Sequence, residues 1–209
     1  MKCTIIFLLA SIMLVTSCTT IPINESRNPS IAVVSVEVIA PIKVFSEMAS
    51  NVCLQKVSNN TGVDDYIICS NFHKKDRVYF LNLTPGEYFI KSASYRVSSS
   101  EFNIRFSNKS VEKTRFKLSE GDFIFLGKMR INSTYIPNGG LVESLKVLTN
   151  LLSYSNSSTI SKVIDSRDNI NYQYRGELIQ LDNSSNLRND YLNSAMKDLE
   201  DGGWESTLK

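Results

Sequence analysis

Short runs of β-branched and aromatic residues that alternate with polar residues are the feature that most constrains the fold of this chain. Successive side chains of a strand point to opposite faces, so period-two alternation predicts strands with one buried face. Turn residues separate the runs, which favours antiparallel pairing between sequence neighbours. We expect strands at 31–39, 51–57, 63–69, 77–83, 87–97, 101–106, 112–118, 122–131 and 171–181.

Two segments depart from this alternation and predict helices. Leucines recur at three- and four-residue steps at 141–152, the spacing of one helix face. Leu187, Tyr191, Ala195 and Leu199 form a second stripe, which predicts a C-terminal helix at about 186–201 ended by Gly202 and Gly203, with Trp204 folding back onto the domain. The predicted class is therefore mainly β, an antiparallel β-sandwich with a helical insertion at about 141–152 and a C-terminal helix.

The N-terminus predicts export. Lys2 precedes an eleven-residue apolar run at 5–15, and the small residues Thr16 and Ser17 follow it, as in a secretory signal peptide. A membrane-spanning helix needs about 20 apolar residues, so this run is too short to be one. An ordinary secreted protein cut near this place is the alternative to the interpretation that follows.

The order Val15-Thr16-Ser17-Cys18 resembles the lipobox of bacterial lipoproteins. The resemblance implies a signal peptide of residues 1–17, cleavage before Cys18, and acyl chains such as palmitate on Cys18. Residues 18–30 contain two prolines and no apolar period, and they predict a lipidated tether, with residues 31–209 as a single domain. The expected location is the bacterial envelope, at the outer membrane, where the acyl chains hold the protein to the membrane.

Two cysteines would remain in the folded part of an exported chain, Cys53 and Cys69. Exported proteins meet oxidising conditions, so we expect a disulfide between them. The competing interpretation is a zinc site that includes His73. A structural zinc site needs four ligands, and His73 is the only histidine of the chain.

The segment Leu83-Thr84-Pro85-Gly86-Glu87-Tyr88, with Phe116-Lys117-Leu118 and Gly121-Asp122-Phe123, resembles prealbumin-like and carboxypeptidase-regulatory-like β-sandwiches. Pro85 and Gly86 are also the residues of a type II turn. The resemblance implies a binding or structural module, and a fold of this kind does not specify one function.

Basic residues dominate the middle of the chain, with twelve Lys or Arg against six Asp or Glu at 73–130. The alternation predicts one basic sheet face that could contact anionic lipid or glycans. An ordinary solvated sheet face is the simpler explanation. The residues of this predicted face are Arg105, Lys113, Arg115, Lys117, Lys128 and Arg130.

No hydrolase, metalloprotease or nucleotide-binding motif occurs in the sequence, so we predict a non-enzymatic protein without a cofactor. We expect no nucleic-acid partner, because the chain is exported. One alternative is an assembly factor that faces the periplasm and docks a partner, such as an envelope protein, through the helix at 141–152. Another is a hydrolase that uses His73 or the pairs Asp64/Asp65 and Asp165/Asp168.

Overall fold

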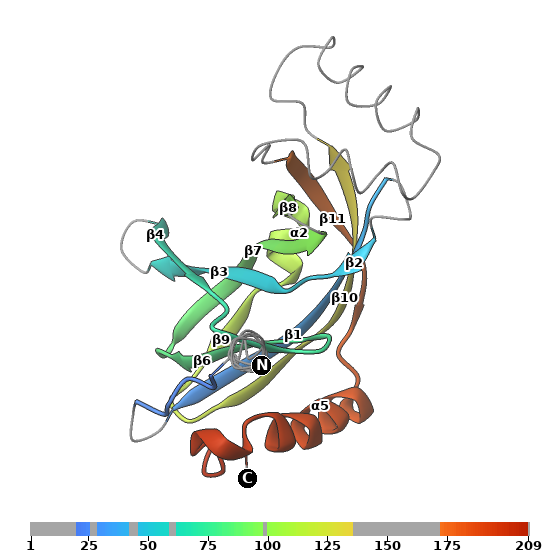
Figure 1. Cartoon of the computed structure of the whole chain (residues 1–209). Helices are drawn as coiled ribbons and strands as arrows, with labels where there is room; N and C mark the ends of the chain where they lie inside the picture. Colours follow the sequence, from blue (N-terminus) through green and yellow to red (C-terminus); the bar gives the residue numbers. More distant parts are fainter. Residues whose placement is uncertain are drawn as a thin grey trace, which may run out of the picture.

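The computed structural model of this protein describes residues 20–25, 29–41, 46–58, 62–97, 100–135 and 172–208. Within these ranges eleven strands form one curled sheet, an open half-barrel (Figure 1). The strands are β1 Ser30–Ile39, β2 Glu47–Met48, β3 Asn51–Ser58, β4 Gly62–Cys69, β5 Phe72–Lys74, β6 Arg77–Leu83, β7 Gly86–Val97, β8 Ser100–Phe106, β9 Phe116–Leu118, β10 Phe123–Tyr135 and β11 Tyr172–Asp182. The helices are α2 Asn108–Lys113, α5 Ser185–Asp198 and the 3-10 helix η3 Glu200–Gly202.

The strand order is β4-β3-β7-β8-β11-β10-β1-β6-β5, with β2 added beside β1 and β9 beside β7. β1 runs parallel to β10, and β11 runs parallel to β8, so the sheet is mixed. The mainly β class is confirmed, but the antiparallel sandwich of two sheets is not. Alternation shows which face of a strand is buried, and it does not show which strand lies beside it.

The predicted hairpin between β3 and β4 is present, and Cys53 and Cys69 lie opposite each other on the two strands. The structure joins these cysteines in a disulfide, with 3.9 Å between their Cα atoms. β4 is therefore covalently fixed to β3, its neighbour at one edge of the described sheet.

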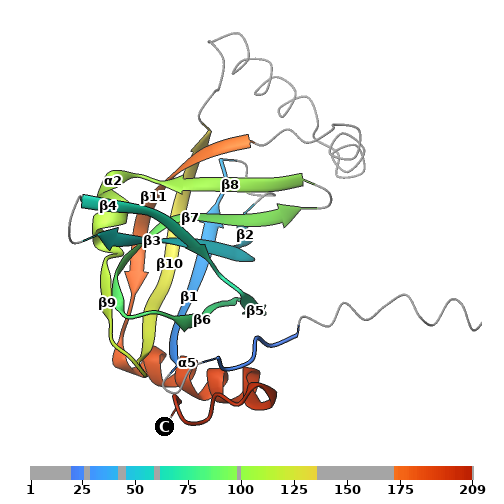
Figure 2. The ribbon, with the colours of Figure 1, turned by 90° about the vertical axis from the view of Figure 1, so that its left-hand side faces the viewer.

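β1 is buried on both faces. Val34 and Val36 belong to the core enclosed by the curled sheet, whereas Ile31 and Val33 belong to a second cluster on the outer face. α5 lies against that outer face (Figure 2), and its Tyr191, Ala195 and Leu199 pack into the second cluster. The predicted C-terminal helix is confirmed, and so is the burial of Trp204, which has no exposed surface.

Two local predictions in the middle of the chain are wrong. The strand expected at 112–118 is shortened to β9, because the helix α2 occupies Asn108–Lys113. Ser107 caps this helix by accepting a hydrogen bond from the Ser110 amide. β6 and β7 are not sheet neighbours, and Gly86 has a φ of +158°, close to extended backbone and unlike the φ near +80° of a type II turn.

A bulge in β10 exchanges the faces of its side chains. Val33 of β1 pairs with Phe125 and Ser35 pairs with Lys128, so β10 has one extra residue between these pairs. Phe125 consequently packs on the outer face and Met129 on the inner face, although the alternation predicted one shared face. Gly127 lies within the bulge, with a φ of +107°.

Replacing Gly127 with alanine should destabilise the fold by about 3 kcal/mol, since a positive φ and overpacking would add together. A Cβ at this position would lie 2.5 Å from Leu181 Cδ1 and 3.0 Å from the Asp182 carbonyl oxygen. Gly203→Ala is the matched control: its φ is +72° but a Cβ there has nothing within 4 Å, so we expect a loss of about 1 kcal/mol. Urea unfolding followed by circular dichroism measures the free energy of unfolding of both variants. Equal losses of stability would contradict the conclusion that the bulge needs a glycine at 127.

Candidate functional site

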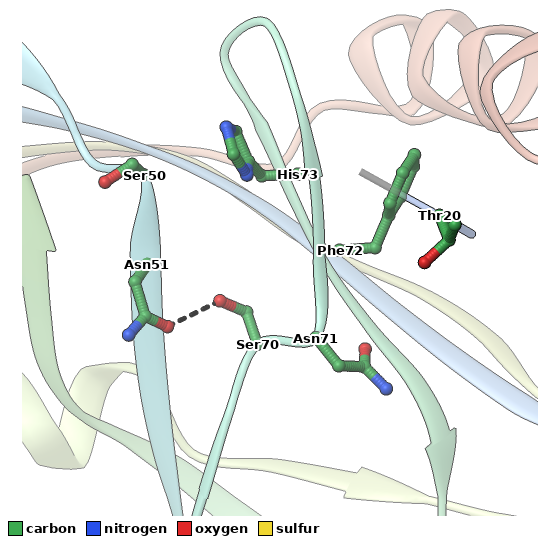
Figure 3. Close-up of a pocket in the computed structure, with 7 residues that line it drawn as sticks. All are labelled: Thr20, Ser50, Asn51, Ser70, Asn71, Phe72 and His73. Atoms are coloured by element: carbon green, nitrogen blue, oxygen red, sulfur yellow. Dashed lines mark hydrogen bonds between the residues drawn. The ribbon is translucent and has the colours of Figure 1, made fainter. Parts of the chain in front are cut away.

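A pocket of about 300 Å³ lies where the two edges of the sheet are connected through Ser70 and Asn71 (Figure 3). These two residues link β4, one edge strand, to β5, the other. We call this pocket the seam pocket. Its lining residues are Thr20, Ser50, Asn51, Ser70, Asn71, Phe72 and His73.

Ser70 is held at the seam by three hydrogen bonds. Its amide donates to the Val52 carbonyl oxygen at 2.8 Å, and its hydroxyl accepts from the Val52 amide at 3.2 Å. The same hydroxyl donates to Asn51 Oδ1 at 2.7 Å, a contact that is visible in Figure 3. The start of β3 and the end of β4 therefore present a fixed pair of polar side chains to the pocket.

Asn71 fixes the other side of the seam. Its Nδ2 donates to the Leu81 carbonyl oxygen at 3.0 Å, and its Oδ1 accepts from the Leu81 amide at 2.9 Å. The side-chain amide thus imitates a neighbouring strand for β6. Phe72 is buried against Tyr79, with 5.6 Å between ring centroids, so its ring belongs mainly to the outer core.

The lining of the seam pocket offers hydroxyl groups, amides and one exposed imidazole, that of His73. Among the described residues that line it there is no carboxylate and no thiol beside His73. Among the residues that the structure describes, no three His, Cys, Asp or Glu side chains could hold a metal ion together. The described lining residues can donate and accept hydrogen bonds.

The cations of the predicted basic face do not form a continuous basic surface, because one of them lies on a helix and others are paired with carboxylates. Lys113 lies on α2 and not on a strand, because the helix replaces the expected strand there. Arg115 follows α2 and forms ion pairs with Glu87 at 3.1 Å and Glu112 at 3.3 Å. Lys117 is exposed on the short strand β9.

The three remaining cations of the predicted basic face are Arg105, Lys128 and Arg130. Arg130 and Lys128 lie close to carboxylates, and Arg105 lies opposite an arginine that is itself paired. Arg130 Nε lies 3.0 Å from Glu37 Oε2, and Lys128 is opposite Asp182 in the sheet register. Arg105 is opposite Arg175, whose Nε lies 3.2 Å from a Glu177 oxygen. The outer face of β8, β11 and β10 is therefore of mixed charge.

A buried ion network of Arg77, Tyr79 and Asp198 joins β6 to α5. Arg77 Nε and Nη2 both lie 2.8 Å from Asp198 Oδ2, and the Tyr79 hydroxyl donates to the same oxygen at 2.7 Å. Burial, and then the bond to Asp198, raises the pKa of Tyr79 far above its ordinary value. Burial lowers the pKa of Arg77, but the hydrogen bond to Asp198 and the attraction of its neighbours outweigh it, so the net pKa is raised. These short, charged hydrogen bonds hold α5 against β6.

Several predicted functional residues lie outside the described part of the chain. These are Cys18, the helix at 141–152 and the pair Asp165/Asp168. Asp64 and Asp65 lie on β4, and their side chains are outside the described part of the structure. The hydrolase and partner-docking alternatives therefore stay predictions.

Comparison with known proteins places this chain in no family: no family model matches it, and no curated protein is detectably similar. In the described ranges, no helix has both the length and the apolar character needed to cross a membrane.

Asp198→Ala should destabilise the protein by about 3 kcal/mol, because the buried Tyr79 hydroxyl loses its acceptor and the largely buried Arg77 guanidinium keeps only its longer contact with Asp76. The triple variant Arg77→Met/Tyr79→Phe/Asp198→Leu should recover most of this loss, since neither a buried charge nor a buried hydroxyl is left without a partner. Arg115→Ala removes two solvent-exposed ion pairs and should leave the unfolding midpoint almost unchanged. Chemical denaturation measures all three, and a harmless Asp198→Ala would show that the network does not fasten α5.

Proposed function

We propose that this protein is a lipid-anchored component of the bacterial envelope, at the outer membrane, and that its half-barrel is a non-enzymatic binding or scaffolding module. The observation that carries the proposal is the order of Lys2, the apolar run at 5–15, the small pair Thr16-Ser17 and Cys18. Each buried methylene contributes about 0.8 kcal/mol, and one acyl chain alone binds a membrane reversibly. Two or three chains on Cys18 would make the attachment stable.

The Cys53–Cys69 disulfide supports export. Disulfides persist in oxidising compartments such as the periplasm and the cell surface, and they are rare in the cytosol. A disulfide that joins an edge strand to its neighbour is therefore consistent with a domain located outside the cytoplasm.

The seam pocket supports binding in preference to catalysis. Its fixed Ser70 and Asn51 side chains can donate and accept hydrogen bonds, and the described part of its lining consists of hydroxyl, amide, aromatic and imidazole side chains. Groups of this kind suit a neutral polar ligand such as a glycan.

Metabolic labelling with radioactive palmitate tests the anchor. We expect label and membrane retention in the native chain, and the loss of both in Cys18→Ala, because the acylated sulfur is removed. Cys3→Ala is the matched control: it changes the other cysteine of the N-terminal segment and should keep both properties. A palmitate-labelled Cys18→Ala protein would overturn the proposal, and protease added to whole cells then distinguishes surface from periplasmic exposure.

A further inference from the structure

Residues 20–25 pack against the C-terminal end of the domain, and we call them the docked segment. The Trp204 indole nitrogen donates to the Pro22 carbonyl oxygen at 3.0 Å, and Asn24 Nδ2 donates to the Gly203 carbonyl oxygen at 3.4 Å. Ile21 is partly buried in the same outer cluster as Trp204. Hydrogen bonds and apolar packing therefore both hold the docked segment on the domain.

Asn82 of β6 holds the other end of the docked segment. Its Nδ2 donates to the Ile23 carbonyl oxygen at 2.9 Å, and its Oδ1 accepts from the Glu25 amide at 3.2 Å. Asn82 has a φ of +64°, a conformation that asparagine tolerates better than most residues. The sequence predicted a free tether over 18–30, but the part of it at 20–25 is built into the domain.

Because the docked segment is packed on the domain, only a short length of chain separates Cys18 from the domain surface. Twelve free residues could span about 40 Å when fully extended. Cys18 precedes Thr20 by two residues, which limits the distance between their Cα atoms to about 7 Å. An acylated Cys18 would therefore bring the side of the domain at Thr20 close to the bilayer.

We propose that the domain has a fixed membrane-facing surface around Thr20, formed by the β5–β6 turn and the C-terminal turn; this rests on the lipid anchor proposed above. Thr20 lines the seam pocket next to Phe72, and His73 of the same pocket precedes Lys74 and Lys75 of the β5–β6 turn (Figure 3). Glu205 and Ser206 follow Trp204, which bonds the docked segment. α2 lies on the side of the domain away from the docked segment (Figure 2).

The charges of this surface fit a zwitterionic headgroup layer. Lys74 and Lys75 are exposed on the β5–β6 turn, and Glu200, Asp201 and Glu205 are exposed at the C-terminal end. Cations and carboxylates of similar number give no strong attraction to an anionic lipid surface. The short connection to the anchor, and not the net charge, sets which side faces the bilayer.

Lysine footprinting on vesicles tests the orientation. The chain beginning at Cys18 is joined to a maleimide phospholipid in phosphatidylcholine vesicles; Cys53 and Cys69 are already bonded and do not compete. A bulky, water-soluble acylating reagent then modifies exposed lysines, which mass spectrometry quantifies. We expect Lys75 to react several-fold less than in the lipid-free chain, whereas Lys113 on α2 should react equally in both.

Two variants show whether the docked segment causes the protection of Lys75. A twelve-residue Gly-Ser insertion after Thr19 should restore full Lys75 reactivity, and Asn82→Gly should raise it, because glycine keeps the positive φ but loses both bonds to the segment. Equal protection of Lys75 and Lys113 at native spacing, or protection of Lys75 that survives the insertion, would overturn the inference. The lipid is attached chemically, so a failure of native acylation would defeat the proposed function and leave this result unaffected.

Discussion

The burial of β1 on both faces is the constraint on which the rest of the structure depends. β1 lies between β10 and β6, and Ile31, Val33, Val34 and Val36 have no exposed surface. A curled sheet by itself can cover only the inner face of a strand such as β1. The outer face needs another element, and α5 with Trp204 provides it.

The covering of this outer face determines where the chain ends lie. α5 is fastened to β6 by the buried ion network of Arg77, Tyr79 and Asp198. Trp204 follows α5 into the same cluster and binds the docked segment through its indole nitrogen. Through these contacts the docked segment, which includes Thr20 of the seam pocket, lies against the residues that follow α5.

Much of the secondary structure could be predicted from the sequence, because alternation and helical stripes are local signals. The helix stripe at Tyr191 and Ala195 is an example, and the hairpin of β3 and β4 is another. The parallel pairing of β1 with β10 could not be predicted, since it joins strands far apart in the chain. The bulge at Gly127 was missed because one added residue reverses the face of every later side chain.

The candidate site was less predictable than the fold. The residues of the seam pocket are ordinary Ser, Asn and Thr side chains from separate segments, and their spacing carries no motif. Asp198 lies in an acidic tail, where nothing distinguishes the one buried carboxylate of the network from its exposed neighbours. The sequence predicts a tether at the docked segment because the contacts that hold this segment are with distant residues, Asn82 and Trp204.

Trp204 is the only tryptophan of the chain, so its fluorescence reports directly on the contact between the docked segment and the covered outer face. The measurement compares the emission maximum of a chain that begins at Cys18 with that of a chain that begins at Ser26. We predict a shift to longer wavelength in the shorter chain, because the indole loses Ile21 and Pro22 and becomes accessible to water. An unchanged emission maximum, in a shorter chain that circular dichroism shows to be folded, would contradict the account.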